Sequence, residues 1–412
     1  MHVLLGSIML YLMLIAVAEA NINDTPATKN WNVNGVLSQG VIDADSSFVD
    51  KDGDISWDVR EFTLNGQYRP LLNVTLAAQV QSRELGDLAP ADGVELDHLL
   101  VDWRFATTGN DELGARAGRI KSVIGIYNDT RDMPFARPSI FLAHSIYSEA
   151  LRDQYLRLDG AELYGSHYFD SGWLTDLGLS WGVAYGEADY TDQAFSNIAG
   201  DAVLGSLDSK ENVRAHLQLN LPMSLDLYFS YADLEYHMET DKVSVPDQAN
   251  LTHWIAGFQW RWNKFELTSE YAEIRIKVNR PMMPSGGMSL MSIQEGNLSQ
   301  TSQSYYFQGR YQFNPAWAGF IRYDMYHLDK NDRYGKEVPD HSLDIRSGSL
   351  SYARTRSLGV SYQPTSQWLL MLEYHYVTGY GWVPPMFDPN ESPMDDKNWT
   401  LIAAQVAYRF GW

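Results

Sequence analysis

Residues near the C-terminus alternate between large apolar side chains and smaller or more polar ones. Every second residue from Ile402 to Trp412 is apolar or aromatic, and the residues between include Gln405 and Arg409. A period of two is typical of a β-strand whose two faces meet different surroundings. The same alternation recurs at 213–220, 254–262, 305–313 and 368–376. Runs of this length suit strands that cross a membrane at a tilt, with aromatic residues at the ends of the apolar faces.

The connections between the alternating segments are of two kinds, and the two kinds take turns along the chain. The short connections are Arg69-Pro70, Thr107 to Glu112, Phe169 to Gly172, Leu221-Pro222, Asn263-Lys264, Asn314-Pro315 and Pro364 to Ser366. The long polar connections are approximately 43–54, 84–93, 123–154, 191–209, 238–250, 278–299, 329–349 and 380–397. This order predicts an all-β fold, a transmembrane antiparallel β-barrel of about sixteen strands with both ends on the short-turn side.

Composition agrees with a barrel and excludes other classes of protein. The mean hydropathy of −0.31 is too polar for a helical membrane protein, whereas a barrel exposes only every second residue to lipid. The absence of cysteine excludes disulfides and cysteine metal sites. A formal net charge of −21 argues against a nucleic-acid partner, since phosphate binding needs a basic face.

The first twenty residues have the features of an export signal. An apolar run extends from Val3 to Ala18, and Ala18-Glu19-Ala20 provides a small-x-small cleavage pattern. The alternative, a retained anchor, is disfavoured because the run is short for a bilayer crossing. We therefore predict a signal peptide over residues 1–20 and a single pore domain over residues 21–412.

Charged residues of both signs fall on the polar register of the strands and are expected to face a water-filled lumen. This predicted lumen wall consists of Arg104, Arg214, Arg261, Glu266, Glu270, Arg310, Arg322, Asp324, Glu373 and Arg409. Either these charges neutralise one another across the lumen, or they form charged rings that select the permeant.

The third long connection, 123–154, is the longest and contains prolines and buried-type apolar residues. This composition predicts that it packs against the barrel interior. The residues expected at the resulting constriction are Arg119, Lys121, Asp129, Arg131, Asp132, Arg137, Glu149, Arg152 and Asp153. An excess of basic residues there favours anions, and the alternative is that these charges pair with one another and hold the loop shut.

Together, the strand number, the rhythm of the loops, the terminal aromatic residue and the third loop resemble the sixteen-stranded porins of Gram-negative bacteria. The basic run Gly118-Arg119-Ile120-Lys121 resembles a strand end of those porins, whereas the acidic Pro-Glu-Phe-Gly tip of the general type is missing, which leaves subfamily and ion preference open. The resemblance implies an outer-membrane location, passive diffusion of small hydrophilic solutes or ions, an inward third loop and a homotrimer. It also implies contact with outer-membrane lipid and lipopolysaccharide, and with the assembly machinery that reads the C-terminal aromatic.

Two other chemistries are weaker predictions. Asp50, Asp52 and Asp54 are spaced like a calcium loop, but Ile55 occupies the glycine position, so a solvated acidic loop is the alternative to loosely bound calcium. His144 and Ser145 are adjacent, a spacing that rarely lets a base face a nucleophile, so an outer-membrane hydrolase is disfavoured. No cofactor or enzymatic activity is expected. A receptor or adhesin barrel that binds through its loops is the remaining alternative to a pore.

Overall fold

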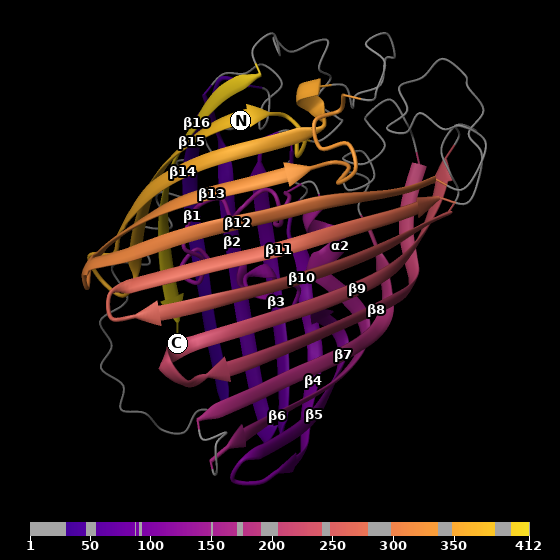
Figure 1. Ribbon diagram of the computed structural model, residues 1–412. Coiled ribbons are helices and arrows are strands. Elements are labelled where there is room, and N and C mark those ends of the chain that lie inside the picture. Colours follow the sequence, from indigo (N-terminus) through magenta and orange to yellow (C-terminus); the bar gives the residue numbers. More distant parts are fainter. Residues whose placement is uncertain are drawn as a thin grey trace.

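The computed structural model describes residues 30–46, 55–86, 88–89, 93–149, 151–170, 176–190, 205–240, 248–278, 298–336, 348–383 and 397–411. Within these ranges, sixteen antiparallel strands form one closed barrel, in which each strand pairs with its neighbours in sequence and β1 pairs with β16 (Figure 1). The strands are β1 (Trp31–Ala44), β2 (Ser56–Leu71), β3 (Val74–Leu85), β4 (Glu95–Thr107), β5 (Asp111–Lys121), β6 (Arg157–Phe169), β7 (Leu177–Asp189), β8 (Gly205–Leu221), β9 (Leu225–Thr240), β10 (Gln248–Trp262), β11 (Phe265–Val278), β12 (Leu298–Asn314), β13 (Trp317–His327), β14 (Tyr352–Tyr362), β15 (Trp368–Gly379) and β16 (Asn398–Gly411). The predicted fold class is confirmed.

The helices within the described ranges are one α-helical turn, α2 (Arg152–Leu156), and the 3-10 turns η1 (Asn128–Thr130), η3 (Pro222–Ser224) and η4 (Gly348–Leu350). No helix in this part of the chain is long and apolar enough to cross a membrane.

Short and long connections alternate around the barrel as the sequence predicts, although one predicted turn falls within β2. The predicted turn at Arg69-Pro70 is wrong, because β2 continues to Leu71 and the turn consists of Leu72 and Asn73. The register between β2 and β3 shifts between Tyr68 and Leu71. An irregular strand end accepts a proline, because the amide that proline lacks is not needed for the ladder there.

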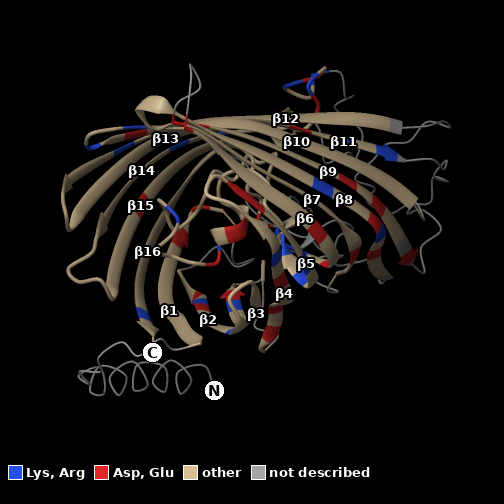
Figure 2. Ribbon diagram, turned by 90° about the horizontal axis from the view of Figure 1, so that it is seen from below, with Lys and Arg blue, Asp and Glu red and all other residues tan. Residues whose placement is uncertain are grey.

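The two faces of the wall differ as the alternation requires. Outward positions carry large apolar side chains that are exposed on the barrel surface, such as Trp262, Phe307 and Leu372. Inward positions on the same strands carry polar or charged residues, such as Gln259 and Glu373, and these are buried. Figure 2 shows charged positions along β2–β5 and on the segment that the ring encloses.

Three glycines lie side by side where the third long connection leaves the wall. Gly118 in β5 pairs with Gly160 in β6, which pairs with Gly186 in β7. A Cβ atom at Gly160 would collide with the carbonyl oxygen of Tyr185, and Gly118 has a φ of +120°, which side chains disfavour. Glycine at these positions therefore permits a close backbone approach beside the start of the loop.

Candidate functional site: the third loop and the channel wall

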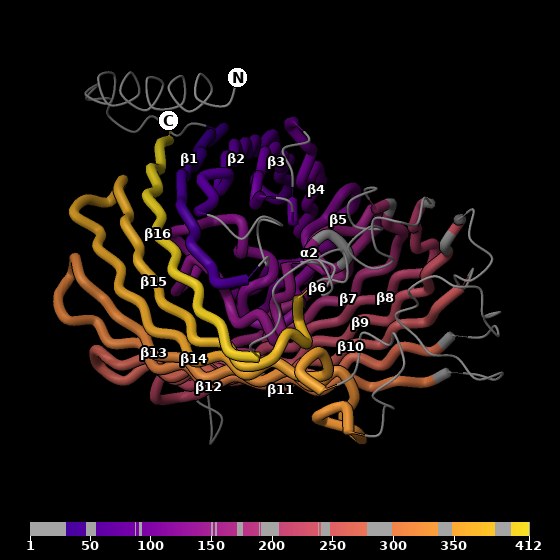
Figure 3. The backbone as a smooth tube through the Cα atoms, turned by 90° about the horizontal axis from the view of Figure 1, so that it is seen from above, coloured from indigo at the N-terminus to yellow at the C-terminus, as the bar shows by residue number. Residues whose placement is uncertain are grey.

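The chain between β5 and β6, residues 122–156, is called the third loop below, and it contacts strands on opposite sides of the ring. The Tyr147 hydroxyl hydrogen-bonds Glu270 of β11, the backbone N–H of Ile140 donates to Glu373 of β15, and Gln79 of β3 donates to Asp132. A segment that reaches opposite walls of a closed barrel lies inside it. The loop and α2 accordingly lie within the ring when the molecule is seen from above (Figure 3).

Apolar packing attaches the third loop to two parts of the wall. Ile140 and Phe141 are buried in a cluster that includes Val59 of β2 and Trp399 of β16. The other apolar side of the loop packs against β8–β12 through a cluster containing Ile124, Tyr127, Leu142, Ala143, Ile146, Tyr147, Leu234, Leu251 and Tyr306. Each large side chain that is fully buried contributes about 1.5–3 kcal/mol, so this packing is the main attraction between loop and wall.

Buried wall residues also satisfy polar groups of the loop backbone. Glu270 accepts hydrogen bonds from the Tyr147 hydroxyl (2.7 Å), the Tyr306 hydroxyl (2.8 Å) and the Ile126 amide (2.9 Å). Arg322 donates to the carbonyl of Phe141 at 2.9 Å. These contacts matter because a buried backbone group without a partner costs about 1–3 kcal/mol.

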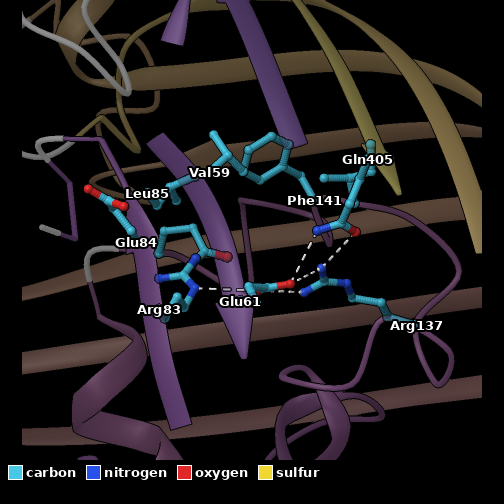
Figure 4. Close-up of a pocket in the computed structure, with 10 residues that line it drawn as sticks. Val59, Glu61, Arg83, Glu84, Leu85, Arg137, Phe141 and Gln405 are labelled. Atoms are coloured by element: carbon cyan, nitrogen blue, oxygen red, sulfur yellow. Dashed lines mark hydrogen bonds and ion pairs between the residues drawn. The ribbon is translucent and has the colours of Figure 1, made fainter. Parts of the chain in front are cut away.

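A network of buried ion pairs joins the loop to β2 and β3. Glu149 lies 2.5 Å from Arg83 and 3.0 Å from Arg131, while Arg137 binds both carboxylate oxygens of Glu61, at 3.2 and 2.7 Å (Figure 4). Burial alone would raise the pKa of Glu149, but the guanidiniums of Arg83, Arg131 and Arg152 hold that pKa well below its usual range. Glu149 is therefore ionised at neutral pH.

A second buried group of charges lies where the loop begins. The Lys121 ammonium lies 3.0 Å from Asp97 of β4 and 2.6 Å from Asp132 of the loop. Asp129 lies in η1, and burial raises its pKa. The pairing hypothesis therefore describes the loop charges better than a field of unpaired cations.

The structure brings together most of the predicted constriction residues but not Arg119. Lys121, Arg131, Asp132, Arg137 and Glu149 all contact the wall or one another inside the ring, as the distances above show, and Arg152 is buried beside them. Asp153 belongs to α2, and its side chain lies outside the described part of the structure.

Placing Arg119 at the constriction is wrong. In the β-ladder Arg119 lies opposite Leu99, a lipid-type residue that is 53 % exposed, and opposite Asp159. Its guanidinium pairs with Asp159 at 2.6 Å. Paired residues of an antiparallel ladder share a face, so Arg119 lies on the outer surface of the barrel. The sequence spacing was misleading because Lys121, two residues after Arg119 in β5, lies at the rim of the barrel, where its side chain turns inward.

The predicted lumen wall divides into a covered half and an open half. Arg214, Glu270, Arg322 and Glu373 face inward but are buried by contacts with the third loop. Asp324 is buried beside Arg322. These five residues do not line open water, and this part of the prediction is corrected. The residues that remain accessible from the lumen are Arg104, Glu266, Arg261, Arg310 and Arg409. Arg409 lies over the ring of Phe135 in the loop, 4.7 Å from its centroid.

One charged group of the lumen was missed by the sequence prediction. Arg116 of β5 lies 3.0 Å from Asp102 and 2.8 Å from Glu162, and its guanidinium stacks on Tyr164, 4.2 Å from the ring centroid. The period of two through β5 and β6 was the available signal, since it places Arg116 and Glu162 on the inward register.

Of the two weaker predictions, only the one on His144 and Ser145 concerns residues that the structure describes. Asp50, Asp52 and Asp54 lie outside the described residues. Within the ranges that the structure describes, no three His, Asp or Glu side chains are grouped to hold a metal ion. His144 stacks on Trp382 with 4.3 Å between ring centroids, and the Ser145 hydroxyl has no hydrogen-bond partner among the described residues, so the two do not form a catalytic pair.

These features define a porin-type fold: a closed antiparallel barrel whose interior holds a long loop. Three solved structures are similar to the chain in fold. An anion-selective porin from Comamonas acidovorans is 10% identical, with a TM-score of 0.53 over 92% of this chain and 99% of that chain. OmpF of Salmonella typhi, in complex with daunomycin, is 13% identical, with a TM-score of 0.56 over 92% and 97%. OmpT of Vibrio cholerae, in its trimer form, is 13% identical, with a TM-score of 0.53 over 92% and 99%.

At these identities, the likeness concerns the fold of the whole barrel. No family model and no curated protein matches the sequence.

Proposed function

We propose that the protein is an outer-membrane porin, a channel through which small hydrophilic solutes and ions diffuse passively. The observation that carries the proposal is the third loop, which spans the interior of a closed barrel whose remaining lumen wall is charged. A barrel of this size leaves a water-filled lumen, and a loop packed inside it narrows that lumen. Catalysis is not part of the proposal.

Conductance measurements test this proposal directly. Purified protein in a planar lipid bilayer is expected to give stepwise conductance, and deletion of residues 129–138 is expected to enlarge each step. Deletion of residues 192–199, in the β7–β8 connection, is the matched control and is expected to leave the step size unchanged. A silent protein would favour a receptor or adhesin barrel and would overturn the porin proposal.

A preference for anions is the finer part of the proposal. Most lumen arginines are paired with carboxylates, but no ion pair is described for Arg310 or Arg409 within the resolved ranges of the wall. These two charges support a weak anion preference, and one of the structures of similar fold is that of an anion-selective porin. The reversal potential in a salt gradient is expected to show more chloride than potassium permeability, and R310Q/R409Q is expected to reduce that ratio. An unchanged ratio of chloride to potassium permeability in this variant would contradict the proposed role of the two arginines in the anion preference.

The proposed assembly is a homotrimer. A structure of similar fold is recorded in a trimer form. Native mass spectrometry of the detergent-solubilised protein is expected to give three copies, and a monomer as the largest species would contradict this assembly.

A further inference from the structure

A small cavity lies between the third loop and the strands β2, β3 and β16 (Figure 4). Its volume is about 10 Å³, close to the least that one water molecule needs. Val59, Leu85, Ile140 and Phe141 form its apolar side. A phosphate, a sulfate or an organic carboxylate is several times too large, so the occupant that fits is a water molecule or a monatomic ion.

Two buried N–H groups on the polar side of this cavity have no acceptor. Arg83 and Arg137 both line the cavity, and among the described residues the Nε atom of each has no hydrogen-bond partner. The Nε atom of Arg83 lies 3.5 Å from a Glu61 oxygen, which is longer than a normal hydrogen bond. Buried donors without an acceptor are destabilising, so two of them at one cavity indicate a bound acceptor.

The carboxylates of the same cluster are already occupied by guanidiniums. The two oxygens of Glu61 accept hydrogen bonds from Arg137 at 3.2 and 2.7 Å. The two oxygens of Glu149 lie 3.0 Å from Arg131 and 2.5 Å from Arg83. Among the described lining residues, the buried side-chain atoms that are left without a partner are therefore the two Nε donors.

The cluster also carries an excess of positive charge. It consists of three guanidiniums and two carboxylates, which belong to Arg83, Arg131, Arg137, Glu61 and Glu149. Glu84, a further carboxylate at the cavity, pairs with Arg60, and this pair adds no net charge. Arginine stays protonated, and a buried charge needs a counter-ion. A monatomic anion in the cavity provides that counter-ion.

We propose that the cavity binds one chloride ion, which accepts the two Nε–H groups and neutralises the excess charge between the third loop and the wall. A halide needs no acceptor of its own, whereas a water molecule has two protons to donate and meets carboxylates that already accept from arginine. The side chains of Arg83, Glu149 and Arg137 around the cavity are 14 %, 8 % and 6 % exposed. The ion is therefore a structural ligand held apart from the passage, and it strengthens the attachment of the loop whether or not the barrel conducts.

The dependence of stability on chloride tests the proposal with the full, purified chain. Sodium chloride replaces sodium gluconate at constant ionic strength, and the midpoint of heat-modifiable unfolding is measured by electrophoresis. The midpoint is expected to rise and to saturate as one site fills, by about 2–4 °C at a chloride concentration ten times the half-saturating one. Protease cleavage within residues 122–156 is expected to be faster in gluconate than in chloride, because the loop is held less firmly without the ion.

A pair of variants separates the two Nε donors from the charge of the cluster. R83K/R137K keeps both positive charges next to Glu61 and Glu149 but has no Nε–H groups, and it is expected to lose the chloride-dependent rise. R119K makes the same change at an ion-paired arginine on the outer face, and it is expected to keep the chloride response of wild type. The difference between these variants also removes any general effect of the salt on stability.

Diffraction from wild-type crystals grown in bromide gives a second measurement that needs no variant. An anomalous peak between Arg83 and Arg137 is expected, and a cavity that contains only water would overturn the proposal.

The stability measurements contradict the proposal in three ways. Equal midpoints of wild type in chloride and gluconate would overturn it, as would a full chloride response of R83K/R137K. A bromide peak without a chloride response in solution would show an adventitious ion only. A conducting protein without a chloride response contradicts this inference alone, whereas a silent protein with the response contradicts the porin proposal alone.

Discussion

The inner wall contains two groups of ion pairs that share their chemistry but differ in their access to water. In the first group, Glu149 of the third loop binds Arg83 of β3 and Arg131 of the same loop, and the three side chains are 8 %, 14 % and 3 % exposed. In the second group, Arg116 binds Asp102 and Glu162 at the open lumen, where Arg116 is 32 % exposed. Charges removed from water must remain paired, whereas exposed pairs are weak and screened by salt. The first group therefore fixes the loop, and the second shapes the field that a permeant meets.

The largest expected effect comes from removing a carboxylate in the buried group. Glu149→Gln leaves Arg83 and Arg131 buried with less compensation, and breaking such a pair costs about 3–5 kcal/mol. Because the ion pair of Glu149 with Arg83 attaches the third loop to the wall, we expect that Glu149→Gln releases the loop. The release is expected to give a larger single-channel step and protease cleavage within residues 122–156. Glu266→Gln is the matched control, because Glu266 lies 3.6 Å from Arg261, and the Arg261 side chain is half exposed. Equal effects of the two variants would remove the distinction between the groups.

Acidification is expected to weaken the same attachment in two stages. Burial lowers the pKa of His144 well below 6.5, and the neighbouring His375 lowers it further. The charged side chains of Glu149, Arg322 and Arg131 also act on the His144 imidazole. Below pH 6.5 a released loop therefore takes up a proton that the packed loop excludes, so packing loses about 1.4 kcal/mol for each pH unit. Glu149 has a lowered pKa, so its contribution is present above pH 4.5 and is lost as the pH falls further.

Single-channel steps recorded at pH 7.5, 5.5 and 4 check both stages. The wild-type step is expected to grow between pH 7.5 and 5.5 and again at pH 4, whereas His144→Gln is expected to lose only the first increase. Growth that begins only below pH 4.5 in wild type would assign the response to carboxylates alone.

The sequence predicted the wall better than the loop contacts, and the reason is physical. Period-two alternation is a local property of each strand, so Trp262 and Phe307 could be placed outward from their neighbours alone. Burial of Glu270 and Glu373 depends on a loop that is more than a hundred residues away in sequence, and no local pattern encodes it. Arg119 was misplaced because at a strand end, beside Gly118, spacing alone does not determine which of two basic residues turns inward.

A moderate effect is expected from the second group, at the open lumen. Arg116→Gln leaves Asp102 and Glu162 facing the passage without their cation, so potassium permeability relative to chloride is expected to rise by about two- to threefold. The change is expected to be larger at 0.01 M than at 1 M salt, because the Debye length falls from about 30 Å to about 3 Å. Reversal potentials at the two salt concentrations measure it, and a shift independent of salt would argue for a structural rather than an electrostatic cause.

The smallest expected effect comes from Arg119→Gln. Arg119 lies three residues from Arg116 in the same strand. Arg119 shares the outer face with Leu99 and pairs with Asp159, and the two charged side chains are 32 % and 38 % exposed. A pair with this exposure contributes about 1 kcal/mol or less to stability. Because the barrel wall separates Arg119 from the lumen, its removal is expected to leave the reversal potential and the step size at wild-type values. The midpoint of heat-modifiable unfolding is expected to fall by only a few degrees. If Arg119→Gln shifts the reversal potential as far as Arg116→Gln does, then Arg119 reaches the passage, and the outer-face position derived from the strand register is wrong.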